Sequence, residues 1–204
     1  MKALLAILIG LCFSTLVLSQ TLMMGIDAGI GASKLEPRPT SPYLQYERFP
    51  AVVFGTQLEY LTKGSTISPK LGFWIEIGGE EGHPLGTMTF PLMIKATFGK
   101  KWRPFLQGGI AGCYVFERSR RYQTSDFSSI YGGGMELALE SGAWLFVEYI
   151  HLAGISSVYD QLKNVTGSTV TLIENHHLRQ YIQFGAMFYL GGNPHYIKNR
   201  LRTE

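Results

Sequence analysis

The stretch TMTFPLMIKATF, residues 87–98, places two kinds of side chain in alternation. One set is apolar throughout: Met88, Phe90, Leu92, Ile94, Ala96 and Phe98. The other set is mixed: Thr87, Thr89, Pro91, Met93, Lys95 and Thr97. Successive side chains of a strand point to opposite faces of a sheet. This stretch therefore predicts a strand with one apolar face and one face that accepts a charge. Pro91 has no N–H to donate, so we expect a bulge or a locally opened pairing there.

The same alternation recurs along the chain. The stretches that show it clearly are MGIDAGIGAS (24–33), KLGFWIEIG (70–78), YGGGMELALE (131–140) and YIQFGAMFYL (181–190). VVFGTQLEYL (52–61) and PFLQGGIAGCYV (104–115) follow it more loosely. With residues 143–153, the chain offers about eight strands of roughly ten residues, the length that a tilted strand needs to cross a bilayer.

The connections between these strands alternate in length. Residues 34–49 and 154–178 form long polar segments, whereas KGSTIS (63–68) and GKKW (99–102) are short. Apart from a medium-length second loop, the order is long, short, long, short. Outer-membrane barrels have short turns at the periplasmic rim and longer loops outside. We therefore expect residues 34–49 and 154–178 to be outer loops.

The stretch AWLFVEYIH, residues 143–151, is apolar on both sets except for Glu148 and its last residue. Keeping Glu148 away from lipid requires that Trp144, Phe146 and Ile150 share its inner face. That facing needs a three-residue turn over residues 140–142, with Gly142 in the left-handed conformation. A two-residue turn would reverse the facing, so we predict the longer turn.

Two kinds of barrel could use one apolar and one polar face. A soluble barrel such as a lipocalin buries the apolar set, whereas a transmembrane barrel turns it toward lipid. Here the apolar set forms continuous ribbons, and the polar set is crowded with Gly, Ala and Ser and carries few charges. A narrow lumen needs small residues, whereas a wet outer face would be rich in charge. The fold class we predict is all-β: an eight-stranded antiparallel up-and-down transmembrane β-barrel.

The ends of the 204-residue chain differ from its middle. Met1-Lys2 precedes an apolar run that ends near Ser19, which is typical of a cleaved signal peptide and less so of a retained membrane helix. We therefore divide the chain into a signal peptide (1–19), a barrel (20–190) and a periplasmic tail (191–204). Cys113 is then the one cysteine of the mature chain, which excludes a disulfide framework.

Charge is scarce, and this limits the classes of partner. Charged residues make up 16% of the chain, and the formal net charge is +3. There is no basic cluster that would suggest nucleic acid. The charges on the inner face are expected to form an ion-pair network, because an enclosed charge is costly unless it is paired. The predicted members are Asp27, Glu59, Lys70, Glu76, Lys95, Arg103, Glu136, Glu140, Glu148 and Arg179.

Features that suggest other chemistry are weak. GGIAG (108–112) lies inside a strand with no helix after it, so glycine lining a barrel explains it better than nucleotide binding. His176-His177 could bind a metal with His83 or His151, but adjacent residues of an extended chain point apart, which favours a solvated loop. We expect no cofactor and no metal.

Two more groups lie near the predicted outer rim. Some outer-membrane barrels are enzymes, and the residues that could serve here are His151, Asp126, Ser128, Ser156 and Asp160. No spacing among them fixes a catalytic triad, so we predict no enzyme. Arg118, Arg120 and Arg121 could contact lipopolysaccharide or simply form a solvated loop.

Several motifs resemble the PorT-like outer-membrane β-barrel family of Bacteroidetes-type bacteria, small barrels of the OmpX and OmpA kind. TFPLMIKATFGKKWRPFLQGGIAGCY is similar to that family's "IPLLLKY … PYLGAGP" signature. IYGGGMELALESGAWLFVEYIHLAGISSV resembles its glycine-rich strand, tight turn and "L-x-E-x-R-Y" strand, and GIDAGIGAS its opening strand. Ile150 stands where relatives often carry Arg. The resemblance implies an eight-stranded barrel, and one namesake member is tied to protein secretion and gliding.

These observations give one leading hypothesis for function. We expect a non-enzymatic integral outer-membrane protein, either a structural or interaction barrel or a narrow pore with a largely filled lumen. Its partners would be outer-membrane lipid, lipopolysaccharide and proteins of the envelope or of a secretion system. The alternatives are a PorT-type secretion accessory, a rim-site enzyme or a soluble ligand-binding barrel.

Overall fold

The computed structural model describes residues 20–38, 48–62, 65–80, 83–116, 125–139, 141–156, 159–165 and 169–191. Within these ranges the strands are β1 (Gln20–Arg38), β2 (Phe49–Thr62), β3 (Ile67–Glu80), β4 (His83–Thr97), β5 (Trp102–Phe116), β6 (Ser125–Ala138), β7 (Trp144–Gly154), β8 (Tyr159–Val165) and β9 (Thr169–Gly191). No helix in this part of the chain is long and apolar enough to cross a membrane.

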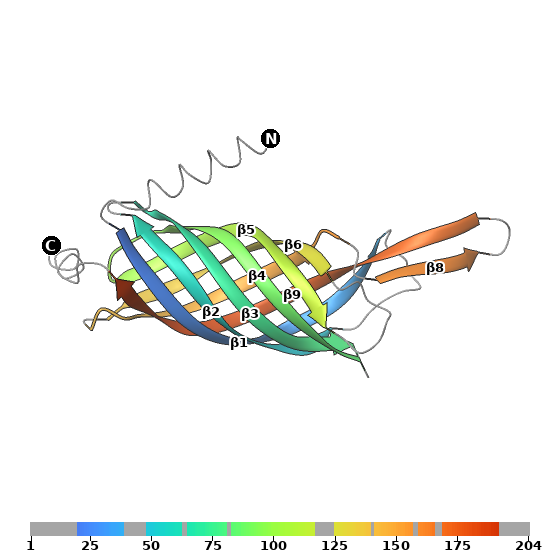
Figure 1. The fold of residues 1–204 in the computed structure, drawn as a ribbon, viewed down its shortest axis with the longest axis horizontal. Coiled ribbons are helices and arrows are strands. Elements are labelled where there is room, and N and C mark those ends of the chain that lie inside the picture. Colours follow the sequence, from blue (N-terminus) through green and yellow to red (C-terminus); the bar gives the residue numbers. More distant parts are fainter. Residues whose placement is uncertain are drawn as a thin grey trace.

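The strands form a closed barrel. Each of β1 to β7 pairs antiparallel with the next, β7 pairs with β9, and β9 pairs with β1 to close the sheet. Eight strands therefore make the wall, which Figure 1 shows as tilted ribbons around one axis. The predicted eight-stranded antiparallel up-and-down barrel is confirmed.

The segment 154–178, which we expected to be a loop, is largely strand. Among the described strands, β8 pairs only with β9, from Tyr159 opposite Asn175 to Val165 opposite Thr169. β1 also continues beside β9 as far as Arg38 opposite Glu174. Figure 1 shows the β8–β9 hairpin projecting beyond one end of the barrel. The loop prediction was wrong because an alternating pattern of polarity predicts a strand only where one face of that strand is shielded from water.

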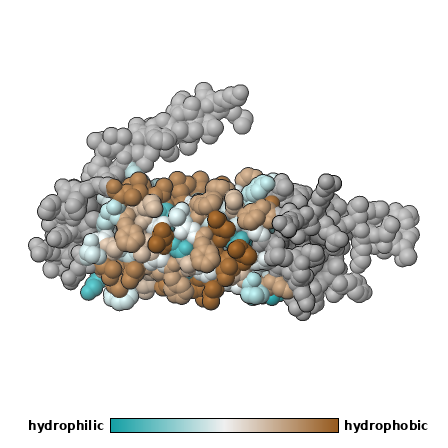
Figure 2. Space-filling view, turned by 60° about the horizontal axis from the view of Figure 1, so that its bottom comes forward, coloured by the Kyte–Doolittle hydropathy of each residue, from teal (hydrophilic) through white to brown (hydrophobic). Residues whose placement is uncertain are grey.

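The stretch 87–98, which lies mostly in β4, has the predicted facing. Phe90, Leu92 and Ile94 are 53%, 48% and 55% exposed on the outside of the barrel. Met93 and Lys95 are 1% exposed on the inside. The same division holds around the wall, and Figure 2 shows apolar residues covering the middle of one side. A continuous apolar belt of this kind is typical of a lipid-facing surface.

Pro91 interrupts one ladder of the sheet. β3 pairs with β4 at Leu71 and Leu92 and again at Trp74 and Thr89, but not at the two positions between them. The register is the same on both sides of the gap, so the pairing opens locally without a bulge. A Cβ added to Gly72 would lie 2.8 Å from Pro91 Cγ, which places the proline ring over this glycine.

The turn between β6 and β7 has the predicted form. The Leu139 N–H donates to the Ala143 carbonyl at 2.9 Å, and the Gly142 N–H donates to the Leu139 carbonyl at 3.0 Å. Gly142 has a φ of 88°, in the left-handed region. The three-residue turn is therefore confirmed, and with it the inward facing of Glu148. Glu140 itself lies outside the described residues.

Replacing Gly142 with Ala is expected to lower the free energy of unfolding by about 1 kcal/mol, because an L-residue is strained in the left-handed region. The nearest side-chain atoms to an added Cβ are those of Tyr189 at 3.6 Å, so the cost is in the backbone. Urea unfolding of the refolded protein in detergent micelles measures the change. Gly112→Ala is the matched control, since its added Cβ meets only Phe127 at 3.9 Å. Equal destabilisation by both variants would contradict the turn assignment.

Candidate functional site

The candidate site is the charged interior of the barrel. The structure places Asp27, Glu59, Lys70, Glu76, Lys95, Arg103, Glu136, Glu148 and Arg179 inside the wall, each at 7% exposure or less. Inward-facing positions of the strands supply all of these side chains. They form three ion-pair clusters and leave one carboxylate, that of Asp27, apart.

The first cluster is centred on Lys95. Its Nζ lies 2.5 Å from Glu59 Oε2 and also donates to Glu136 Oε1. Glu59 Oε1 accepts a further hydrogen bond from Ser68 Oγ at 2.5 Å. Arg103 Nε lies 3.8 Å from Glu136 Oε2. Glu59 is on β2 and Glu136 is on β6, which have three strands between them in either direction, so the cluster crosses the lumen.

The second cluster joins another pair of opposite strands, β3 and β7. Lys70 Nζ donates to Glu148 Oε2 at 2.9 Å and to Oε1 at 3.2 Å. Gln107 Nε2 donates to Glu148 Oε2 at 2.7 Å, and Gln107 Oε1 accepts from Lys70 at 3.2 Å. Every member is at most 6% exposed. This arrangement satisfies the charges that an enclosed lysine and glutamate bring into the lumen.

The third cluster surrounds Arg179 of β9. Arg179 Nη1 donates to Glu76 Oε2 at 2.7 Å and to Thr89 Oγ1 at 3.2 Å. Its Nη2 donates to Ser128 Oγ and to Cys113 Sγ, both at 2.9 Å. Tyr181 also donates its hydroxyl to Glu76 Oε2, at 3.0 Å.

Sequence reasoning missed two members of this cluster. Asp126 Oδ2 lies 3.9 Å from Arg179 Nη2, and Cys113 Sγ accepts from the same nitrogen. Cys113 is separated from Arg179 by 66 residues, so no local motif links the two. The signal that was available is the inward register of each residue on its own strand.

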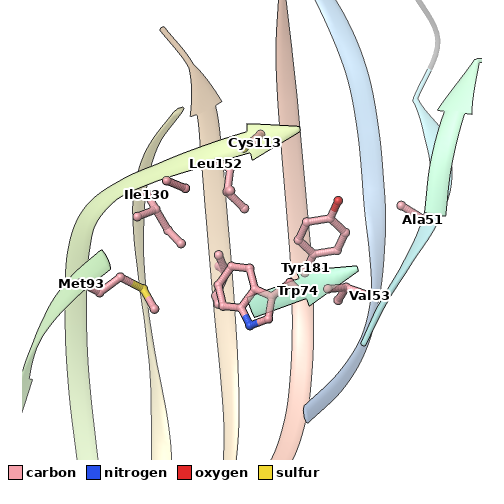
Figure 3. Packing of buried hydrophobic residues seen from close by; sticks show 10 residues of the cluster. Ala51, Val53, Trp74, Met93, Cys113, Ile130, Leu152 and Tyr181 are labelled. Carbon is pink, nitrogen blue, oxygen red and sulfur yellow. The ribbon is translucent and has the colours of Figure 1, made fainter. Parts of the chain in front are cut away.

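Apolar side chains fill the lumen between the second and third clusters. Along β3 the order of inward residues is Ser68, Lys70, Gly72, Trp74 and Glu76. Trp74 is therefore between the Lys70 and Arg179 clusters, and it is fully buried. Figure 3 shows its indole ring inside the barrel near the Tyr181 ring. Met93, Ile130 and Leu152 belong to the same buried cluster.

The rim residues whose side chains are described do not form a catalytic triad. His151 faces outward, where its ring stacks on Tyr131 at 4.6 Å between centroids and its Nδ1 lies 3.1 Å from Gln180 Nε2. Asp126 and Ser128 face the lumen on the other side of the wall. Ser156 Oγ donates to Asp126 Oδ1 at 2.7 Å. The side chain of Asp160 lies outside those described.

His176 and His177 correct another expectation. They lie in β9 and are 5% and 4% exposed, so they are not in a solvated loop. Exposed apolar side chains of β9 run from Ile182 to Leu190, which places both histidines beyond the apolar belt. Burial, followed by the charge of Arg179, holds the pKa of His177 well below its ordinary value. Among the described side chains, no three of His, Cys, Asp and Glu come together as a metal site.

Several predicted features fall outside the described residues. These are the signal peptide (1–19), Glu140, the arginines at 118, 120 and 121, and the tail from residue 192. The prediction of a lipopolysaccharide contact therefore stays a prediction.

Comparisons with known proteins agree on the fold. No protein-family model and no curated protein matches the chain. Neisserial surface protein A, NspA, has a similar structure with a TM-score of 0.56 at 9% identity, over 80% of this chain and 95% of that one. OprG, an outer-membrane protein of Pseudomonas aeruginosa, gives a TM-score of 0.53 at 10% identity, over 83% and 96%. The outer-membrane protein AlkL gives 0.50 at 10% identity, over 86% and 93%. The fold is thus that of small outer-membrane barrels.

Proposed function

We propose that this protein is a non-enzymatic integral barrel of the outer membrane whose lumen is closed to bulk flow. Under this proposal the barrel anchors and presents the outer extension formed by β8, β9 and the end of β1. Export through a cleaved signal peptide belongs to the same proposal, and N-terminal sequencing of the mature protein should then begin at Gln20. The apolar belt and the similarity of fold to outer-membrane proteins support the location.

One observation supports the proposal of a closed lumen: charged pairs and aromatic rings cross the lumen at successive levels. Lys95 and Lys70 each connect opposite walls, and Arg179 connects β9 to β3 and β4. Trp74 fills the space between them. A passing ion would have to separate buried, hydrogen-bonded charge pairs, which costs several kcal/mol for each pair that loses one partner. A narrow pore is therefore the less favoured alternative.

Conductance in planar bilayers tests the closed lumen. The wild-type barrel is expected to insert without stable single-channel steps. The double variant Trp74→Ala, Tyr181→Ala removes the two aromatic rings and is expected to raise conductance. A heat-dependent band shift on gels establishes that both proteins are folded. Stable steps from the wild type would favour the narrow pore instead.

A secretion-accessory role of the PorT type is the second candidate. It is favoured by the outer extension, since β8 pairs with β9 along one edge and has no partner along its other edge within the described residues. Open strand edges are templates for pairing with another chain. Replacing residues 158–172 by a short turn should abolish co-purification of an envelope protein after crosslinking, while the barrel still folds. Unchanged recovery of that protein would exclude the extension as its binding site.

A further inference from the structure

Asp27 differs from the other acidic residues of the lumen. Its side chain is 7% exposed, and neither carboxylate oxygen has a hydrogen-bond partner among the described residues. By contrast, each remaining acid of the lumen lies within 4.0 Å of a Lys or Arg nitrogen: Glu59, Glu76, Asp126, Glu136 and Glu148. Trp74 lies beside Asp27, since the Cβ that Gly55 would carry is 2.1 Å from Trp74 Cδ1 and 3.0 Å from Asp27 Oδ1. Trp74 Nε1 nevertheless has no hydrogen-bond partner among the described residues. A buried carboxylate without a partner is costly.

Two glutamines lie on either side of Asp27 along β1, against the inward positions before and after it. Asp27 and the glycines at 25 and 29 are consecutive inward positions of β1. Gln57 Cγ and Gln183 Cγ each lie 2.8 Å from the Cβ that Gly25 and Gly29, respectively, would carry. Both glutamines are at most 1% exposed, and within the described part of the chain the oxygen and nitrogen of both amides have no hydrogen-bond partner. Unsatisfied polar side chains thus lie at three consecutive inward levels of β1, which indicates that a ligand or solvent belongs there.

The charges of the lumen give the sign of that ligand. The buried acids inside the described barrel are Asp27, Glu59, Glu76, Asp126, Glu136 and Glu148, and the buried bases are Lys70, Lys95, Arg103 and Arg179. Acids therefore outnumber bases by two. Lys70 acts on Asp27 electrostatically, but its ammonium group already donates to Glu148 and Gln107. The unsatisfied carboxylate is thus an acceptor site in an interior with two more acids than bases among the described residues.

We propose that a monovalent metal cation, Na⁺ or K⁺, binds in the lumen beside Asp27, with the Gln57 and Gln183 amide oxygens as further ligands. Hard cations take carboxylate and amide oxygens. A single free carboxylate balances one positive charge, whereas a divalent ion would call for more. The inference goes beyond the proposed function, since a bound ion of this kind is compatible with a closed or a conducting barrel.

The experiment is urea unfolding of the full chain in detergent micelles at constant chloride concentration. NaCl or KCl is compared with N-methyl-D-glucamine chloride, whose cation is too large for the site. Binding to the folded state alone lowers the unfolding constant about tenfold for each tenfold rise in cation concentration above Kd. The wild type is expected to follow this dependence. Equal midpoints in all three salts would overturn the proposal, and a midpoint that rises only with acid would identify a bound proton instead.

Variants separate the site from general salt effects. Asp27→Asn is expected to abolish the difference in urea midpoint between the metal chlorides and N-methyl-D-glucamine chloride. Gln183→Leu leaves the charge of the lumen unchanged and is expected to reduce that difference. Glu36→Gln removes one acid outside the lumen and is expected to keep it. Retention of the full difference by Asp27→Asn would also overturn the proposal. If that variant fails to fold, crystals of the wild type soaked in Tl⁺ decide the matter: an anomalous peak beside Asp27 supports the site, and its absence excludes it.

Discussion

Replacing Lys95 with Met is expected to lower the free energy of unfolding by about 3–5 kcal/mol, because removing one partner leaves buried charge uncompensated. Two carboxylates, those of Glu59 and Glu136, depend on the Lys95 ammonium group. Met retains most of the volume of the side chain, so the loss is electrostatic rather than a cavity. Urea unfolding in micelles, followed by tryptophan fluorescence and by the heat-dependent band shift, measures the effect.

Lys101→Met is the matched control for this change. Lys101 is exposed in the turn before β5, and its loss removes the same charge from the same chain. Its effect is expected to stay within about 0.5 kcal/mol, as for most surface substitutions. Similar stabilities for the two variants would show that the Lys95 cluster does not stabilise the barrel.

The second large effect is expected on the outside of β4. Leu92→Arg should destabilise the barrel in lipid bilayers by about 2–4 kcal/mol, the cost of arginine at the middle of the lipid-facing side. Leu92 is 48% exposed, so a barrel surrounded by water would accept the arginine readily. The measurement compares the refolding yields and urea midpoints of this variant and the wild type in phosphatidylcholine vesicles. Thr66→Arg, in the exposed turn before β3, is the control and is expected to have little effect. Tolerance of arginine at position 92 would argue against a lipid-facing belt.

Alternation along single strands was enough to predict the facing of the wall. Lys95 could be assigned to the lumen because its neighbours in sequence are apolar, and Glu148 because its alternative position would be in lipid. The prediction at Glu148 also required the shape of the turn at Gly142, which glycine made recognisable. These inferences use only local geometry, which is why sequence suffices for them.

The pairing partners inside the lumen required more than local geometry. Arg179 meets Glu76 across 103 residues of chain, and only the relative register of several strands brings the two together. The outer extension escaped prediction for a different reason. Both faces of β8 lie beyond the apolar belt, so its residues carry no alternation to be read. His176 and His177 were misjudged as solvated for the same reason.

The cross-lumen contacts also bear on how the barrel is assembled. Glu76 and Thr89 find their common partner only when β9, the last strand of the wall, has arrived. Contacts between the two ends of a chain form late and slow folding, because the intervening loop must be closed first. Until then, Glu76 remains uncompensated beside an unpaired edge. Insertion is therefore expected to be cooperative, with charge neutralisation and ring closure in one step and no stable partly closed barrel before it.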